Sequence, residues 1–210
     1  MITEVQRVAE VLLTRYGHVH RNDAYAWPYA SQRVLDCVLS LNRQYNAVVR
    51  PRVERFAARR ADIQSLKELL SLMRQYPSPH AFCVAELEYN DARRAKTLIG
   101  VVDYLLDAQV DHPGADECER LTHWASWCRP GDHLTVGVQG FGLAGFQYLR
   151  MLFGAQTVKP DVHIINFVSE LLERPLTPVQ ALNIMERAAA LVHLPLREVD
   201  AEIWRERAAP

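Results

Sequence analysis

Apolar residues recur every three or four positions along almost the whole chain. Val5, Val8 and Leu12 form one such stripe near the N-terminus, and Leu98 and Val101 belong to another in a longer run. This spacing puts the apolar side chains on one face of an α-helix, whereas a strand would need apolar and polar residues to alternate. Since no stretch alternates in that way between hairpin dipeptides, the pattern predicts an all-α protein.

Capping residues and apolar stripes give approximate bounds for the expected helices. Asp91 and Thr177 can accept backbone N–H groups at a helix start, and Pro178 suits a first turn because its fixed φ is already helical. The expected helices lie near residues 5–13, 34–41, 66–73, 91–106, 115–127, 143–152, 161–172, 178–192 and 196–207. No repeat at a solenoid period and no low-complexity tract interrupts this series.

Charge is unevenly spread along the chain. The 210 residues suffice for one or two compact domains, and their formal net charge of −1 argues against a surface that binds DNA everywhere. Residues 43–60 nevertheless contain six arginines and one glutamate, a local balance of six minus one, or +5. Arg52, Arg55 and Arg59 share one helical face there and form a candidate phosphate-binding stripe; the alternative is an ordinary solvated face.

Cysteine spacing and the N-terminal residues exclude several classes of protein. The four cysteines have no C-x-x-C spacing, so free thiols are expected rather than a metal site; they are Cys37, Cys83, Cys118 and Cys128. Residues 1–15 are amphipathic and include Glu4, Arg7 and Glu10, which a signal peptide or membrane span would not tolerate. We expect a soluble, cytoplasmic protein, associated with the nucleoid if the source is prokaryotic.

A glycine-rich segment, Val138-Gln139-Gly140-Phe141-Gly142, precedes one of the expected helices. Two glycines around one apolar residue suit a tight hairpin in which Phe141 reaches the core while the backbone stays open to close approach. Unpaired N–H groups and the positive end of the helix dipole would favour a phosphate oxygen at the start of the next helix. The alternative is a plain helix–helix connection, since any of these can use two glycines.

Asp161 follows Pro160 one helix after this hairpin, and its ordinary role would be a helix N-cap. Hairpin and aspartate together resemble the helix-hairpin-helix DNA glycosylase superfamily, often called HhH-GPD, in which an aspartate and commonly a histidine follow the hairpin after one helix. The triplet Asp161-Val162-His163 is the form seen in the 8-oxoguanine glycosylase branch. Two further segments, 38–42 and 199–204, are also similar to that family, so the resemblance spans roughly residues 34–204.

The resemblance implies roles for the hairpin and for His163. The N–H groups of Gly140 and Gly142 would hold a DNA backbone phosphate, and His163 in the first turn after Asp161 would donate to a phosphate; a partly buried structural histidine is the alternative. Backbone carbonyls would form a candidate site for a monovalent cation, at Val136, Val138 and Phe141.

The resemblance also implies the chemistry. Asp161 would stabilise the positive charge that develops on the sugar during glycosidic cleavage and would orient or deprotonate the attacking water. Asn42 would fill the gap that the flipped nucleotide leaves in the base stack; alternatively it ends a helix or makes a turn. Four aromatic side chains are candidates for a base pocket, and the alternative is that they belong to the core. They are Trp27, Tyr29, Trp124 and Trp127.

The chain departs from the family pattern in ways that narrow the reaction. Ala144 occupies the position at which bifunctional members carry a lysine that forms a Schiff base. The resemblance therefore implies a monofunctional glycosylase without lyase activity, unless Lys159 reaches the sugar. Gln139, Gly145 and Phe146 also depart from the commoner residues of the family, and the four-cysteine iron–sulfur loop of endonuclease III-like relatives is missing, so no cluster is expected.

We therefore expect two helical subdomains with a cleft between them. A barrel-like bundle would span residues 30–156 and include the hairpin, and a second unit would combine residues 1–29 with 157–210. The expected partner is double-stranded DNA that carries a damaged base, bound by a monomer without a membrane contact; the sequence does not name the lesion. Two rivals are a catalytically silent helix-hairpin-helix DNA-binding module and an all-α protein-interaction scaffold.

Overall fold

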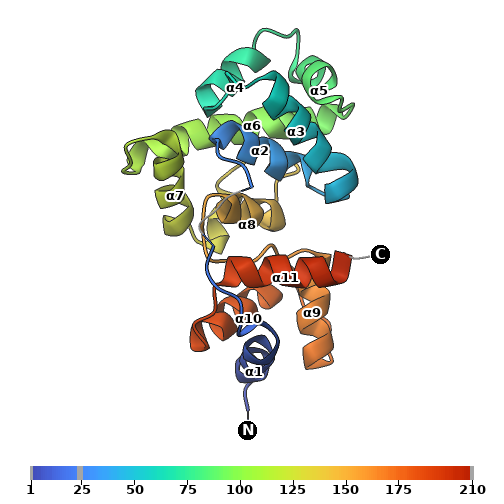
Figure 1. Ribbon diagram of the computed structural model, residues 1–210, viewed down its shortest axis with the longest axis vertical. Helices are drawn as coiled ribbons and strands as arrows, with labels where there is room; N and C mark the ends of the chain where they lie inside the picture. Colours follow the sequence, from blue (N-terminus) through green and yellow to red (C-terminus); the bar gives the residue numbers. More distant parts are fainter. Residues whose placement is uncertain (1, 23–25, 209–210) are drawn as a thin grey trace. The chain divides into compact units, whose positions relative to one another are not determined.

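Helices are the only regular secondary structure in residues 2–22 and 26–208, the part of the chain that the computed structural model describes (Figure 1). The expected all-α class is confirmed. The chain divides into two compact units, the first from the described residues of 1–24 and 154–210 and the second from those of 25–153. The unit boundaries thus fall at 24/25 and 153/154, rather than at 29/30 and 156/157 as expected from the sequence.

Unit 1 combines one N-terminal helix with three C-terminal helices. They are α1 (Glu4–Tyr16), α9 (Val162–Leu172), α10 (Pro178–Leu191) and α11 (Leu196–Ala208). Helix α1 packs along α10 although the two are far apart in the sequence (Figure 1). The predicted start of α10 is confirmed, because the Thr177 side chain accepts the N–H of Gln180 and the Gln180 side chain reaches back to Thr177.

Unit 2 contains seven α-helices among its described residues. They are α2 (Ala30–Leu39), α3 (Arg50–Arg59), α4 (Leu66–Met73), α5 (Pro79–Leu87), α6 (Ala92–Ala108), α7 (Glu117–Trp127) and α8 (Leu143–Leu152). Short helices join them, namely the π-helix η1 (Tyr45–Val49) and the 3₁₀-helices η2 (Gln109–Asp111) and η3 (Pro130–Leu134). Helix α6 is central, since it packs against α2, α4 and α5 (Figure 1). Asp91 caps it as expected, by accepting the N–H of Arg94.

A buried carboxylate ties three segments of unit 2 together. Asp36 on α2 is fully buried and accepts hydrogen bonds from Trp27 Nε1 at 2.6 Å, from the Tyr45 hydroxyl at 2.6 Å and from the Tyr148 hydroxyl at 2.7 Å. These donors belong to the segment before α2, to η1 and to α8. Burial and the Asp36 carboxylate raise the pKa of Tyr148, so that its hydroxyl keeps the proton it donates.

No helix within the described residues is long and apolar enough to cross a membrane. The longest of them, α6, has 17 residues and carries two arginines and a lysine in its first turns. Its apolar residues instead form one buried face, which includes Leu98, Val101 and Leu105.

Candidate functional site

The hairpin predicted from the two glycines contains a tight β-turn. The Phe141 N–H donates to the Val138 carbonyl at 3.1 Å, and Gly140 at the third position of this turn has a φ of +81°. This conformation is that of a type II turn, which favours glycine because an L side chain is strained there. Phe141 is 5% exposed, so its ring anchors the turn in the core of unit 2 as expected.

Helix α6 supports this turn from one side. The Thr97 hydroxyl donates to the Gln139 carbonyl at 3.0 Å, and a Cβ added to Gly140 would meet the same hydroxyl at 3.2 Å. One turn further along α6, a Cβ on Gly100 would meet the Val138 side chain at 3.0 Å. The hairpin is therefore fixed against α6 by a hydrogen bond and by close packing.

The N-terminus of α8 follows the turn directly and has no side-chain cap. Its N-cap is Gly142, whereas the N-termini of α1, α4, α5, α6, α7, α9 and α10 are each capped by a side chain. Gly142 is exposed, its φ is −97°, and a Cβ added to it would meet nothing within 4 Å. Neither space nor backbone strain requires glycine here, so the open backbone at Gly142 is available for the close approach of a ligand.

Asn42 belongs to the same unit as the hairpin, in the turn that follows α2. It is exposed and has a φ of 57°, the left-handed conformation that asparagine tolerates better than most residues, and it lies beyond Ser40, the C-cap of α2. Its neighbour Leu41 packs on α8, because a Cβ on Gly145 would meet Leu41 Cδ2 at 2.8 Å and Phe141 at 3.0 Å. Of the ordinary roles expected for Asn42, the structure shows the turn rather than the helix cap, and its neighbour Leu41 lies beside Phe141 of the hairpin.

Asp161 and His163 belong to unit 1. The Asp161 side chain caps α9, since its Oδ1 accepts the His163 N–H at 3.0 Å, and its Oδ2 lies 3.7 Å from Lys159 Nζ. The Asp161 side chain is 23% exposed and that of Lys159 is 21% exposed. The capping role is thus confirmed, while one carboxylate oxygen stays beside an amine near the surface.

A second carboxyl group, Asp200 on α11, holds the loop that carries Asp161. Asp200 Oδ1 accepts the backbone N–H of Lys159 at 3.0 Å, and the Asp161 N–H in turn donates to the Lys159 carbonyl at 2.7 Å. Burial, followed by the charge of Asp161, raises the pKa of Asp200 to about 8, against the opposing effects of the Lys159 N–H and ammonium. Asp200 therefore carries a proton at neutral pH.

We expect this proton to make stability depend on pH. The folded-state pKa lies above the ordinary value of 3.8, so the folded protein holds a proton that the unfolded chain releases, and the free energy of unfolding falls as pH rises from about 3.8 to about 8. Asp200→Asn keeps an oxygen for the Lys159 N–H but cannot ionise. Urea denaturation should therefore show the variant gaining stability over the parent between pH 5 and pH 8; equal pH slopes would contradict the prediction.

Each arginine of the predicted stripe has a hydrogen-bond or ion-pair partner within the protein. Arg52 donates to the Val48 carbonyl at 2.8 Å and to the Glu88 carbonyl at 3.3 Å, and Arg55 pairs with the Glu88 carboxylate at 2.9 Å. Arg59 donates to the Glu86 carbonyl. All three guanidinium groups thus meet residues at the C-terminal end of α5, where unpaired carbonyls favour cations.

The four candidate pocket aromatics have different surroundings. Trp124 is 1% exposed and packs edge-on against Tyr104, Phe146 and Phe153, so it belongs to the core. Trp27 is buried as well and donates to Asp36, while Tyr29 is half-buried at the N-cap of α2. Trp127 is 81% exposed. The structure does not gather these four side chains into one pocket.

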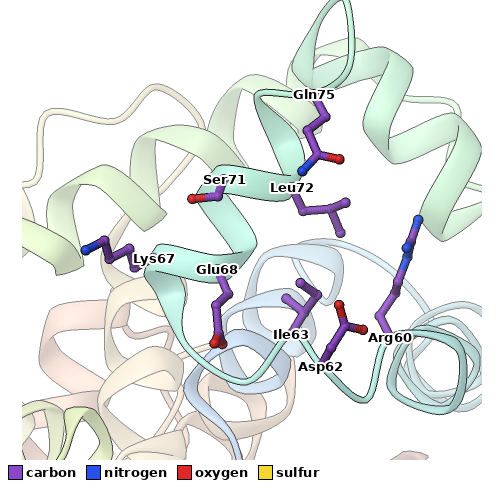
Figure 2. A pocket seen from close by; sticks show the side chains of 8 residues that line it. All are labelled: Arg60, Asp62, Ile63, Lys67, Glu68, Ser71, Leu72 and Gln75. Carbon is purple, nitrogen blue, oxygen red and sulfur yellow. The ribbon is translucent and has the colours of Figure 1, made fainter.

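A surface depression of about 460 Å³ lies elsewhere in unit 2. Figure 2 shows that its lining side chains come from α4, from the loop after α3 and, in the case of Gln75, from the residues that follow α4. Two of its charged groups have internal partners, since Arg60 pairs with Glu86, and Glu68 accepts the Ser65 N–H at 2.8 Å. No group of three or more potential metal-ligating side chains occurs within the described residues. The depression therefore offers few unengaged charges to a ligand.

Sequence reasoning missed several residues around the candidate site. Asp36 and Asp200 escape detection because each acts on segments far away in the sequence, and their own helices give no sign of it. Arg93 and Lys96 on α6 were also missed, because the densest run of positive charge lies in residues 43–60. The sequence signal for these two residues is that they lie four positions before Thr97 and Gly100. That spacing becomes informative only when the structure shows that the hairpin packs on α6.

The comparisons with known proteins give a family without an assigned activity. A family described as a domain of unknown function, DUF8548, matches residues 8–208. The chain belongs to this family. No curated protein and no solved structure matches it. The matched segment spans both units and includes the hairpin and Asp161.

Proposed function

We propose that this protein is a monofunctional DNA glycosylase that hydrolyses the N-glycosidic bond of a damaged base flipped out of duplex DNA. The observation that carries the proposal is the type II turn at Gly140, which leads into an uncapped α8 with an open backbone at Gly142. Such an N-terminus favours a phosphate oxygen. The exposed Asn42, whose neighbour Leu41 packs beside Phe141 of this hairpin, would enter the base stack.

Asp161 supplies the chemical group in this proposal. One of its oxygens caps α9, and the other lies 3.7 Å from the Lys159 ammonium. A carboxylate in this state can stabilise positive charge on the sugar and accept a proton from the attacking water. His163, in the first turn of α9, would donate to a phosphate nearby.

A catalytically silent DNA-binding module is the second candidate, and two observations favour it. Ala144 stands at the hairpin position where a lysine would form a Schiff base, and it lies in the first turn of α8. Asp161 also has a complete structural role as an N-cap, which needs no substrate. Such a module would bind DNA through the same hairpin but would release no base.

The first experiment identifies the reaction. Duplexes that each contain one lesion, among them alkylated purines, oxidised guanine and deaminated bases, are incubated with the protein and then treated with alkali to cleave abasic sites. A glycosylase gives cleavage for at least one lesion, and only after alkali if it lacks lyase activity. DNA binding without cleavage of any duplex would favour the silent module, and no binding at low salt would favour a protein-interaction scaffold.

A glycine substitution tests the phosphate site separately from the chemistry. We expect Gly142→Ala to lower the melting temperature by only a few degrees, because the added Cβ meets no atom within 4 Å although alanine is a poorer N-cap than glycine. It should weaken duplex binding by about tenfold, because the methyl group obstructs a phosphate hydrogen bond worth about 1–1.5 kcal/mol. Fluorescence anisotropy with a labelled duplex measures the affinity.

Gly131 provides a matched control for this test. It is exposed in η3, and a Cβ added there also meets nothing within 4 Å. Gly131→Ala should leave both the melting temperature and the affinity unchanged. Equal affinities of Gly142→Ala and the parent would count against a phosphate at the hairpin.

A further inference from the structure

Two cations on α6 have no partner among the described residues. Arg93 and Lys96 are exposed, and neither side chain makes a hydrogen bond or ion pair with another described residue. Arg52 and Arg55, by contrast, are bonded to the end of α5. Charges without an internal counterion are those that can contribute to binding a polyanion.

Their register places these two cations beside the hairpin. Arg93 precedes Thr97 by four residues and Lys96 precedes Gly100 by four, and Thr97 and Gly100 are the α6 residues that contact the turn. Side chains four residues apart lie about one helical turn from each other on the same face. Arg93 and Lys96 therefore extend the hairpin-bearing face of α6 by about 5.4 Å, one turn, toward its N-terminus.

The charges around this edge of α6 leave it positive. The acidic residue at the N-terminus of α6 is Asp91. It is paired with Arg43 at 3.2 Å, and it caps α6 by accepting the Arg94 N–H at 3.0 Å. Arg94 itself donates to the Leu41 carbonyl at 2.8 Å, next to the Asn42 turn. The next acids along α6 are Asp103 and Asp107, about two and three turns beyond Lys96.

We propose that Arg93 and Lys96 bind a second DNA phosphate, adjacent on the same strand to the one held at the hairpin. The proposal rests on the DNA-binding function proposed above. It adds two residues that contribute to the salt dependence of the affinity for DNA. Neighbouring phosphates on one strand of duplex DNA are displaced by about 3.4 Å along the helix axis, so one turn of α6, about 5.4 Å, is long enough to reach from one to the next.

Salt dependence of binding tests this assignment without any catalytic readout. The affinity of the full chain for an undamaged duplex is measured by fluorescence anisotropy over a range of KCl concentrations. Each phosphate neutralised steepens the negative slope of log affinity against log salt by about 0.9. Because the two side chains bind one phosphate, the double variant Arg93→Gln/Lys96→Gln should reduce the magnitude of the slope by about 1, and each single variant should reduce it by less. Both sites are exposed, so the melting temperature should not change.

Arg52→Gln is the matched control, because it removes the same charge from a guanidinium group that is bonded internally. We expect it to keep the parent slope and to lower the melting temperature. If the parent binds DNA with a salt-dependent affinity but the slope of the double variant Arg93→Gln/Lys96→Gln equals that of the parent, the α6 site is wrong while DNA binding stands. If the parent binds no duplex at low salt, the proposed function itself is wrong.

Discussion

Asp161→Asn should abolish most base release, by about a hundredfold or more, while leaving duplex affinity close to that of the parent. The amide has the size of the carboxylate and can still accept the His163 N–H that the carboxylate now accepts at 3.0 Å. It lacks the negative charge that stabilises a cationic sugar and the basicity that activates water, effects worth about 10²–10⁴ in rate. Single-turnover base excision on the lesion that the duplex panel identifies measures the loss.

An aspartate with the same structural role separates catalysis from capping. Asp116 caps α7, where its Oδ1 accepts the Glu119 N–H at 2.8 Å. Asp116→Asn should affect stability about as little as Asp161→Asn, since asparagine is a good N-cap, and should leave base release unchanged. Base release at the parent rate in Asp161→Asn would remove Asp161 from the mechanism; a parent that binds DNA and releases no base would instead be the silent module.

The helices that local signals define could be predicted closely. The α8 bounds are as expected, because a glycine precedes the helix and its apolar stripe ends where the helix ends. Asp91, Asp161 and Thr177 cap their helices as expected, since an N-cap depends on the next three residues alone. Such features need no knowledge of the rest of the fold.

Helix α5 shows where prediction from local pattern failed. Ser78 caps it and Pro79 begins it, but its buried positions include Glu86 as well as Phe82 and Leu87. Glu86 is buried because it pairs with Arg60 and Tyr76, which lie outside α5. A charged residue on the buried face interrupts the apolar stripe from which a helix is predicted. Only the tertiary contact of Glu86 explains why this residue is buried.

The candidate site was predictable only in part, for the same reason. The turn at Gly140 and the cap at Asp161 follow from short motifs, whereas the arginine stripe was inferred from spacing that does not show what each guanidinium group contacts. Arg55 finds its counterion Glu88 at a separation of 33 residues. Which arginines remain available to a ligand is therefore a property of the fold, and it favours Arg93 over the stripe.

The largest effect on stability is expected from Asp36→Ala, which should lower the free energy of unfolding by about 3 kcal/mol or more. The substitution leaves Trp27 Nε1 and the hydroxyls of Tyr45 and Tyr148 without the acceptor that now lies 2.6–2.7 Å away. Burial is the first cause that raises the pKa of Tyr45 as well as of Tyr148, so both hydroxyls stay protonated and lose a hydrogen bond rather than ionise. Urea denaturation followed by tryptophan fluorescence measures the loss.

Two single-donor variants show whether the carboxylate acts as a hub. Tyr45→Phe and Tyr148→Phe each remove one donor while leaving the acceptor bonded to the other, so each should cost about 1.5–3 kcal/mol and less than Asp36→Ala. Asp36→Asn keeps the shape but presents an N–H₂ group to a site that supplies donors, and it should therefore behave more like Asp36→Ala than like the parent. A loss below about 1 kcal/mol in Asp36→Ala would mean that water replaces the carboxylate, and that the segments before α2, after Asn42 and after the hairpin are held together by apolar packing instead.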